Sequence, residues 1–420
     1  MSGVGQLNLP HYPEIEGLDD FKGKLMHSAR WDWSYPLEGK RIGIIGNGAT
    51  AAQIIPEVSK VASSLTVFQR TPNWVIPRDD GKISPTTQAA LKYIPGLRSR
   101  YRALLMDVRE GLYNTTIVKG SEGNDAMRAW AQDFMHKQIP GRPDLWEKLT
   151  PKYALGCKRV LISDDFYPAL GQDHVKLETS PIQRVTEKGV AVEGNEYEFD
   201  LLILATGFRT TEFMYPIKVV GTGGRSIEEI WKGGAKAYLG VTIDSLPNFG
   251  MLYGPNTNLG HNSIILMIES QSRYINSLIA PVLKAKSQGQ SLAIVPRPSR
   301  VKAYNEDLQV KLSGLTFADP NCNSWYKTAD GLITNNWAGT VVQYQKALSK
   351  VNWASDYEAS GSGADIVASK DQEYIGRVVE ETVVPVLAIT TYATVAAALA
   401  LGWKVASKSP TVQKAIASVF

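Results

Sequence analysis

Apolar residues in the first part of the chain form short runs separated by a segment with helical spacing. Arg41 to Ile45 and Leu65 to Phe68 are brief apolar runs typical of buried parallel strands. Between them, Ala52 to Val61 has the periodicity of a helix. The order predicts a β-strand, an α-helix and a second β-strand, the unit from which dinucleotide-binding domains are built.

The pattern changes twice further along the chain. Residues 84–150 carry mixed charges with Leu, Met, Trp and Phe at helical spacing, which predicts a helical insertion. Short strands return over 151–195, so we assign 36–83 and 151–195 to one nucleotide-binding domain. A further domain is expected over 196–350, with strands at Leu201 to Ala205 and Asn248 to Tyr253 and one long helix from His261 to Ala285.

The two ends of the chain have different compositions. Residues 1–35 contain scattered Gly and Pro without apolar periodicity and are expected to be an extended connecting segment. Residues 351–382, with Gly and Ser at 360–363, are expected to be a flexible linker. Residues 383–403 carry no charge and are long enough for a transmembrane helix, with a buried terminal helix as the alternative.

Composition narrows the class of protein. The chain has 420 residues, 44% hydrophobic and 20% charged, which is globular and sufficient for two or three domains. A formal charge of +4 does not indicate a nucleic-acid partner. Cys157 and Cys322 lack a metal-binding or redox spacing, so we predict neither a disulfide framework nor a metal site, as in a reducing compartment. The N-terminus has no secretory signal pattern.

A glycine turn follows the first predicted strand. Gly46, Asn47, Gly48, Ala49, Thr50 and Ala51 match the pattern GxGxxA between a strand and a helix. Missing side chains there let the backbone approach a pyrophosphate at the helix N-terminus. The candidate cofactor-binding residues at this turn are Ile45, Gly46, Asn47, Gly48, Ala49, Thr50, Ala51 and Gln53.

The end of the second strand indicates which dinucleotide binds. An NAD site places an acidic residue there to hold the ribose hydroxyls. This chain has Gln69, Arg70 and Thr71 instead. A cation suits a 2′-phosphate, so we predict NADP, with Arg70 as phosphate ligand and Gln69 and Thr71 as neutral donors. The alternative is a solvated arginine at the end of a strand.

Residues 21–32 carry the most specific motif. Phe21, Gly23, His27, Trp31 and Asp32 satisfy F-x-G-x-x-x-H-x-x-x-W-D at all its fixed positions. The motif resembles the signature of type I Baeyer–Villiger monooxygenases. Further segments resemble that family in the same order, over about residues 1–345; they are Cys157 to Arg159, Asp200 to Phe208, Tyr238 to Gly240, Gly254 to Thr257, Ser324 to Tyr326 and Asn336 to Trp337.

The resemblance implies an α/β fold with two dinucleotide-binding domains, one for FAD and one for NADP. It makes Arg159 the candidate catalytic residue, a fixed cation that stabilises the anionic oxygen nucleophile and the tetrahedral adduct. It makes Lys158 a second ligand of the 2′-phosphate and His27 a linker residue rather than an acid or base. The remaining implied cofactor contacts are Thr206, Gly207, Gly254, Asn256 and Trp325.

The FAD fingerprint of this family is not found in the sequence. Residues 1–35 resemble the end of an FAD domain with its linker, and 196–350 resemble the C-terminal part of that domain. We therefore expect a truncated form or a second polypeptide that supplies the rest. Residues 1–420 alone are expected to purify with little flavin, because the pyrophosphate contacts of FAD are missing.

Three functions stay open on these grounds. The first is an FAD- and NADPH-dependent oxygenase that uses O2 to convert a bulky ketone, such as a secondary metabolite, to an ester or lactone. The second is a flavin N- or S-oxygenase of the same fold, which Trp31, Asp32 and Arg159 disfavour. The third is an inactive NADP-binding remnant. The catalytic part is expected in the cytosol or at the cytosolic face of a membrane.

Overall fold

The computed structural model describes residues 1–382. They belong to two compact units. The larger comprises residues 1–84 and 108–378, and the described residues of the smaller are 85–107 and 379–382. The larger unit carries all the site residues predicted above.

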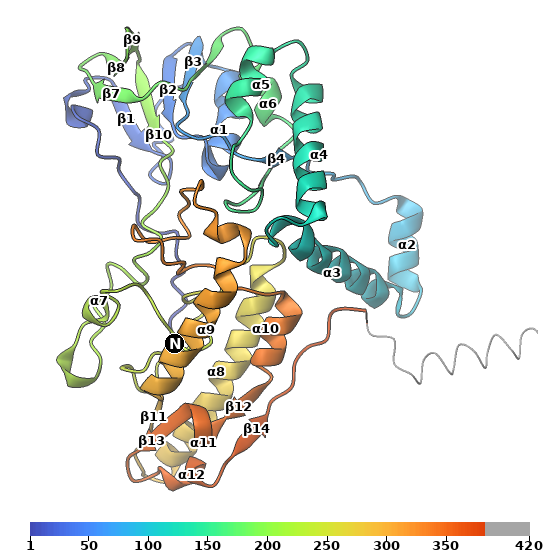
Figure 1. The fold of residues 1–420 in the computed structure, drawn as a ribbon, viewed down its shortest axis with the longest axis vertical. Helices are drawn as coiled ribbons and strands as arrows, with labels where there is room; N and C mark the ends of the chain where they lie inside the picture. The colour runs from blue at the N-terminus through green and yellow to red at the C-terminus, as the bar shows by residue number, and fades with distance from the viewer. Residues whose placement is uncertain (383–420) are drawn as a thin grey trace, which may run out of the picture. The chain divides into compact units, whose positions relative to one another are not determined.

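A parallel five-stranded sheet forms the centre of one half of the larger unit, in the order β1-β10-β2-β3-β6 (Figure 1). Every residue of β10 is buried, and its apolar side chains alternate between the two faces: Leu201 and Ile203 join one core, Leu202 and Leu204 the other. Both faces are therefore covered, as is usual for parallel sheets. The strands are Lys24–His27 (β1), Arg41–Ile45 (β2), Ser64–Phe68 (β3), Val175–Glu178 (β6) and Leu201–Leu204 (β10).

Helices cover one face of this sheet and a small antiparallel sheet covers the other. Ile55 of α1, Met135 of α4 and Leu170 of α6 pack on the first face, while Val190 of β8 packs on the second with Phe199. A two-stranded sheet, Val75–Ile76 (β4) with Leu161–Ile162 (β5), lies beside α4. The covering elements are Ala49–Ser59 (α1), Glu122–Gln138 (α4), Pro143–Leu149 (α5), Phe166–Leu170 (α6), Ile182–Val185 (β7), Gly189–Val192 (β8) and Asn195–Glu198 (β9).

The sheet corrects the expected domain boundaries. β1 lies within residues 1–35 and β10 within 196–350, both of which the family resemblance assigns to the FAD domain. Both strands instead pair in the nucleotide-binding sheet, where β10 lies between β1 and β2. The reason is hydrophobic: a strand as apolar as β10 needs a neighbour on each side and a cover on each face.

The other half of the larger unit is mainly helical. The long helix α8, predicted over 261–285, spans Ile264–Ser287 and packs against α10. The strand expected over 248–253 does not form in the described chain, where Met251 makes an isolated bridge to Ser2. The elements here are Thr222–Gly224 (η2), Ile227–Ile230 (α7), Ala293–Pro296 (β11), Pro298–Ser313 (α9), Thr316–Ala318 (η3) and Val341–Ala347 (α10). The short helix Leu18–Asp20 (η1) belongs to the sheet half, where it lies against β7.

The prediction of a flexible linker over 351–382 is wrong for most of that range. Tyr357–Ser360 (β13) pairs with β11, and Lys350–Asn352 (β12) pairs with Gln372–Tyr374 (β14). Trp353–Asp356 (α11) and Asp365–Ala368 (α12) complete this segment. Gly361 turns the chain with φ +99°, and a Cβ there would meet the Ser291 carbonyl oxygen at 2.5 Å. Glycine at this position therefore allows the backbone to pass close to Ser291, and it does not indicate a flexible linker.

Cys157 and Cys322 form a disulfide bond, although they are 165 residues apart. Our prediction of unpaired cysteines is therefore wrong. The two side chains lie in a buried cluster with Trp74, Tyr153 and Leu155. The same loops are also joined by Ala154 N, which donates to Asp319 Oδ2 at 2.7 Å. The bond fastens the segment carrying Lys158 and Arg159 to the loop that precedes Trp325.

The smaller unit contains Pro85–Tyr93 (α2) and the first half of Leu97–Thr116 (α3). Within it, Arg102 pairs with Glu380 at 3.6 Å and the Thr382 amide donates to Asp107 at 3.1 Å. Among residues 1–382, no helix has both the length and the apolar composition needed to cross a membrane. Residues 383–403, the candidate transmembrane segment, lie outside the described part of the chain.

Candidate functional site

The glycine turn has the geometry of a phosphate cradle. Gly46 has φ +109°, and a Cβ there would lie 2.5 Å from the Ala205 carbonyl oxygen, so only glycine fits. Gly48 is the N-cap of α1, no side chain caps the helix, and a Cβ there would meet nothing within 4 Å. The first-turn N–H groups of α1, from Ala49 to Ala51, therefore face open space beside a backbone without side chains, which suits an anion.

Asn47 and Gln69 fix the shape of this turn. Asn47 Nδ2 donates to Gln69 Oε1 at 2.7 Å and to the Thr71 carbonyl at 3.0 Å. Gln69 Nε2 donates to the Lys148 carbonyl at 2.8 Å, and the Gln69 side chain is buried. The Gln69 side chain thus supports the turn from within the protein, and its role as a neutral donor to the nucleotide stays a prediction. Gln53 similarly bonds back to Ala49.

Arg70 and Lys158 come together from distant parts of the chain. Arg70 is exposed at the end of β3, while Lys158 is half-buried over the ring of Tyr153. Burial lowers the pKa of Lys158, and the charge of Arg70 lowers it further. The ion pairs within residues 1–382 include neither of these cations nor Arg159. Two neighbouring cations without a carboxylate favour a doubly charged anion.

The signature motif at 21–32 has a structural explanation. Phe21 is buried under β7 and β8, and a Cβ on Gly23 would lie 2.9 Å from the Asp200 carbonyl oxygen. Asp32 accepts a hydrogen bond from Lys24 at 2.5 Å, which lowers the pKa of Asp32 to about 2. Trp31 packs on the core of the large sheet. These residues hold β1 at the edge of the sheet.

His27, the central residue of that motif, is buried against the turn after β10. Its Nδ1 accepts the Ala29 amide at 3.0 Å, and its Nε2 has no hydrogen-bond partner within the described chain. Burial lowers the pKa of His27, and the nearby Gly207 backbone opposes that effect. Gly207 has φ +81° and open space at its Cβ position, and Thr206 Oγ1 donates to the His11 carbonyl. The predicted contacts Thr206 and Gly207 therefore lie beside His27.

Arg159 lies within electrostatic reach of two buried phenols from other segments. Burial raises the pKa of Tyr253 to about 12, and the charge of Arg159 opposes the rise. Burial also raises the pKa of Tyr326, and Arg159 again opposes it. The exposed Arg159 is therefore within electrostatic range of Tyr253, which precedes Gly254, and of Tyr326, which follows Trp325; its catalytic role stays a prediction.

A cluster of buried amides adjoins this place. Asn256 Nδ2 donates to the carbonyls of Ile333 and Asn336, and Tyr253 OH donates to Asn258 Oδ1. The side chains of 334–336 are at most 1% exposed. Within the described chain, several of their polar atoms have no hydrogen-bond partner: Thr334 Oγ1, Asn335 Oδ1 and both polar atoms of Asn336. Buried polar groups normally find partners, so these atoms indicate a ligand or water.

The backbone around this cluster is strained. Leu239 and Tyr253, which carry large side chains, have φ of +54° and +55°. Gly240 and Gly254 pack back to back, since a Cβ on Gly254 would meet the Gly240 carbonyl oxygen at 2.3 Å. Left-handed conformations in such residues cost about 1–2 kcal/mol each. Strain of this kind concentrates at functional sites.

The predicted residues therefore fall into two groups. The glycine turn, Arg70 and Lys158 form one, and Arg159, Gly254, Asn256 and Trp325 form the other, where the Trp325 carbonyl accepts from Thr210 and Asn335. Ile45 instead packs in the core below the sheet. Sequence reasoning missed Tyr253, Asn258, Thr334 and Asn335. The signal for them was the density of Asn in 256–258 and 335–336 within an apolar neighbourhood.

Comparison with known proteins identifies relatives. The flavin-binding monooxygenase-like family model matches residues 1–220. The FAD-binding monooxygenase ktnD of Aspergillus niger is 56% identical over 384 residues, which cover 91% of this chain and 63% of the relative. A Baeyer–Villiger monooxygenase of Streptomyces coelicolor is 39% identical over 355 residues, 84% of this chain and 67% of the relative.

A solved structure supports the same assignment. Oxidised steroid monooxygenase bound to NADP is 28% identical to this chain, with a TM-score of 0.68, covering 82% of this chain and 71% of the other. The chain spans about 63% of the Aspergillus niger relative. The match to the family model and the identity to the Streptomyces coelicolor protein confirm the resemblance inferred from the signature motif. The chain belongs to the flavin-binding monooxygenase-like family, together with Baeyer–Villiger monooxygenases.

Proposed function

We propose that this chain is the catalytic and NADP-binding part of an FAD- and NADPH-dependent monooxygenase that inserts one oxygen atom beside a ketone carbonyl. The observation that carries the proposal is Arg159, a cation outside the ion pairs of residues 1–382, beside a strained and buried polar turn. The names of the relatives in Aspergillus niger and Streptomyces coelicolor support it.

The residues present fit NADP and the flavin-ring end of FAD. The open cradle at Gly48 and the two cations Arg70 and Lys158 suit NADP, with its pyrophosphate at α1 and its 2′-phosphate between the cations. The Thr334 hydroxyl and the side-chain amide atoms of Asn335 and Asn336 that have no partner within the described chain suit the polar edge of a flavin ring. FAD, when bound, supplies the electron transfer and the activation of O2.

Arg159 acts on the charge that develops during oxygen insertion. Its guanidinium presents donors that remain protonated at any working pH. A tetrahedral adduct on the ketone carbon carries negative charge on oxygen, and a fixed cation beside it lowers the barrier. The partly and fully buried phenols of Tyr253 and Tyr326 lie within electrostatic range of this cation. In this proposal Arg159 stabilises the negatively charged adduct from which the ester or lactone forms.

The dinucleotide domain in this proposal comprises the five-stranded sheet with its covers, including β1 and β10. Residues 84–150 are the helical insertion, and the helical half with the amide cluster holds the flavin ring. Gln69 supports the turn through Asn47 and Lys148. A bulky ketone fits the aromatic loops around Trp325 and Trp337, which contribute to a common cluster.

The test is product analysis with isotopically labelled O2. The chain is completed with a polypeptide that carries the FAD fingerprint, supplied with FAD and NADPH, and given a panel of bulky ketones, sulfides and amines. We expect esters or lactones that carry one labelled oxygen atom. Faster turnover of sulfides or amines than of every ketone would indicate an S- or N-oxygenase instead. No labelled product from any substrate would contradict the proposal and favour a nucleotide-binding role alone.

Replacement of Arg70 tests the cofactor assignment. Arg70→Ala is expected to raise the Kd of NADPH by about tenfold to a hundredfold, since a charged hydrogen bond contributes roughly 1.5–3 kcal/mol. The Kd of NADH should change by less than about twofold. Calorimetric titration with both nucleotides measures this difference. Arg184→Ala, an exposed arginine on β7, is the matched control. If the affinities for NADPH and NADH fell equally, Arg70 would not be a ligand of the 2′-phosphate.

A further inference from the structure

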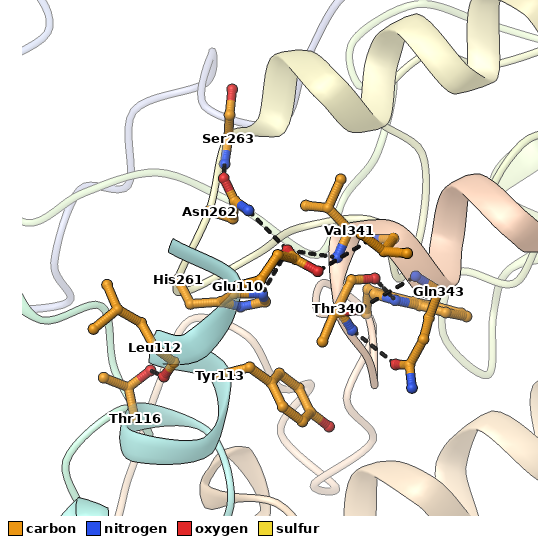
Figure 2. Close-up of polar contacts among 12 residues, drawn as sticks. Glu110, Leu112, Tyr113, Thr116, His261, Asn262, Ser263, Thr340, Val341 and Gln343 are labelled. Carbon is orange, nitrogen blue, oxygen red and sulfur yellow. Dashed lines mark hydrogen bonds and ion pairs between the residues drawn. The ribbon is translucent and has the colours of Figure 1, made fainter. Parts of the chain in front are cut away.

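Glu110 is the centre of a polar cluster that the proposed function does not use. It lies on α3 within the larger unit, and Figure 2 shows its carboxylate between the 261–262 segment and the start of α10. The carboxylate accepts Asn262 Nδ2 at 2.7 Å and the amides of Val341 and Val342 at 3.1 and 3.2 Å. His261 Nε2 lies 3.7 Å away.

The cluster is buried and the carboxylate is charged. The side chain of Glu110 is 14% exposed and that of His261 is 1% exposed. Burial by itself raises the pKa of Glu110, but the neighbouring His261 ring and the hydrogen bonds from Asn262 and the Val342 amide outweigh it and bring the pKa to about 2. Tyr113, one helical turn along α3, packs edge-on against His261 and donates to the Ala338 carbonyl at 3.0 Å. A buried carboxylate remains charged only with such compensation, which here comes from the donors of Asn262, Val341 and Val342.

Two chain segments that carry the amide cluster meet at Glu110. Residues 256–258 and 334–337 run side by side: Asn256 N donates to Thr334 O, Asn258 N to Asn335 O, and Trp337 N to Asn258 O, all within 2.9 Å. A few residues further along the chain, each segment contacts the Glu110 carboxylate. The first reaches His261 and Asn262, and the second reaches Val341 and Val342. One carboxylate therefore ties both segments just beyond the amides that adjoin Arg159.

We propose that Glu110 is a positioning residue that clamps these two segments in register, so that the amides of 256–258 and 334–336 keep their arrangement beside Arg159. This rests on the proposed function for its catalytic consequence. A carboxylate is required because it offers acceptors in every direction, whereas the NH2 group of glutamine would face the donors of Asn262 or α10. An unsatisfied or opposed donor in a buried cluster costs more than its bond contributes.

The clamp is tested first by hydrogen exchange on the full chain, which does not depend on activity. In Glu110→Gln, peptides covering 256–263 and 333–342 should exchange at least about tenfold faster than in the wild type, because the single carbonyl oxygen of glutamine cannot replace both carboxylate oxygens, one of which accepts from Asn262 and Val341 and the other from Val342. Peptides covering 41–70 should be unchanged. Glu147→Gln, an exposed glutamate on α5, is the control and should change nothing. Unchanged exchange at 333–342, or an equal rise over 41–70, would overturn the clamp.

The catalytic consequence is tested separately. With FAD supplied, Glu110→Gln should lower kcat for the ketone at least about tenfold, with the Kd of NADPH within about twofold of the wild type. Glu110→Asp keeps the charge and should recover part of kcat, which a merely space-filling side chain would not explain. Equal losses in kcat and NADPH affinity would contradict a positioning role. A wild type without turnover would reject the proposed function, while the exchange result would still decide the clamp.

Discussion

Arg159→Ala is expected to reduce formation of the oxygenated product by about a hundredfold to a thousandfold, the effect of removing one preorganised charge-stabilising donor. The side chain is exposed, so its loss leaves no cavity, and the fold should persist. NADPH should still bind, because the variant leaves Arg70 and Lys158, the proposed ligands of the 2′-phosphate, unchanged. Product yield per NADPH consumed, measured by chromatography with FAD supplied, is the quantity to compare.

Lys158→Ala is the informative control for this prediction, since it removes the neighbouring cation. It should weaken NADPH binding yet support near-normal turnover once NADPH is saturating. The two variants therefore separate oxygen insertion from nucleotide binding within one short segment. If Arg159→Ala converts ketone at close to the wild-type rate, Arg159 is not the catalytic cation and the proposed mechanism fails.

Gly46→Ala and Gly48→Ala are expected to affect different properties although they lie two residues apart: the first should lower stability and the second should weaken NADPH binding. At Gly46 a methyl group meets the Ala205 carbonyl at 2.5 Å with φ +109°, and the Ala205 amide is itself bonded to Ile45 in the sheet. The cost is about 3 kcal/mol or more of unfolding free energy, because neither backbone can move aside. Gly46→Ala should therefore lower the melting temperature clearly.

Gly48→Ala should change the unfolding free energy by less than about 1 kcal/mol, because its φ is ordinary and its Cβ position is open. The added methyl group occupies the space where the pyrophosphate approaches, so NADPH affinity should fall at least about tenfold. Thermal unfolding and nucleotide titration of both variants provide the comparison. Full NADPH affinity in Gly48→Ala would mean that the nucleotide does not lie over this turn.

Several parts of the molecule follow from local sequence pattern alone. Apolar runs at 41–45 and 65–68 around a helical segment predict β2, α1 and β3, and the structure confirms them. The helix at 264–287 is predicted within a few residues. The signature at 21–32 indicates the family that the match to the family model confirms. These features depend on neighbours along the chain, where periodicity states directly which face is buried.

Other features depend on segments that are far apart in sequence. The place of β10 between β1 and β2, the disulfide between Cys157 and Cys322, and the pairing of β13 with β11 all contradict the expectations from sequence pattern. Composition at 351–382 indicates flexibility, but the pairing partner of Tyr357–Ser360 lies some 60 residues earlier, at Ala293–Pro296. Local pattern carries no information about such partners.

The sequence by itself determined the α/β class, the glycine turn and the family, and it predicts the phosphate-binding role of Arg70. Only the tertiary structure decided which of these residues meet: Lys158 with Arg70, Arg159 with Tyr253 and Tyr326, and Glu110 with His261 and the start of α10. The physical reason is that burial and charge act over a few ångströms in space. Charged and polar residues that are far apart along the chain influence one another only when the fold brings them close together and lowers the effective dielectric constant between them.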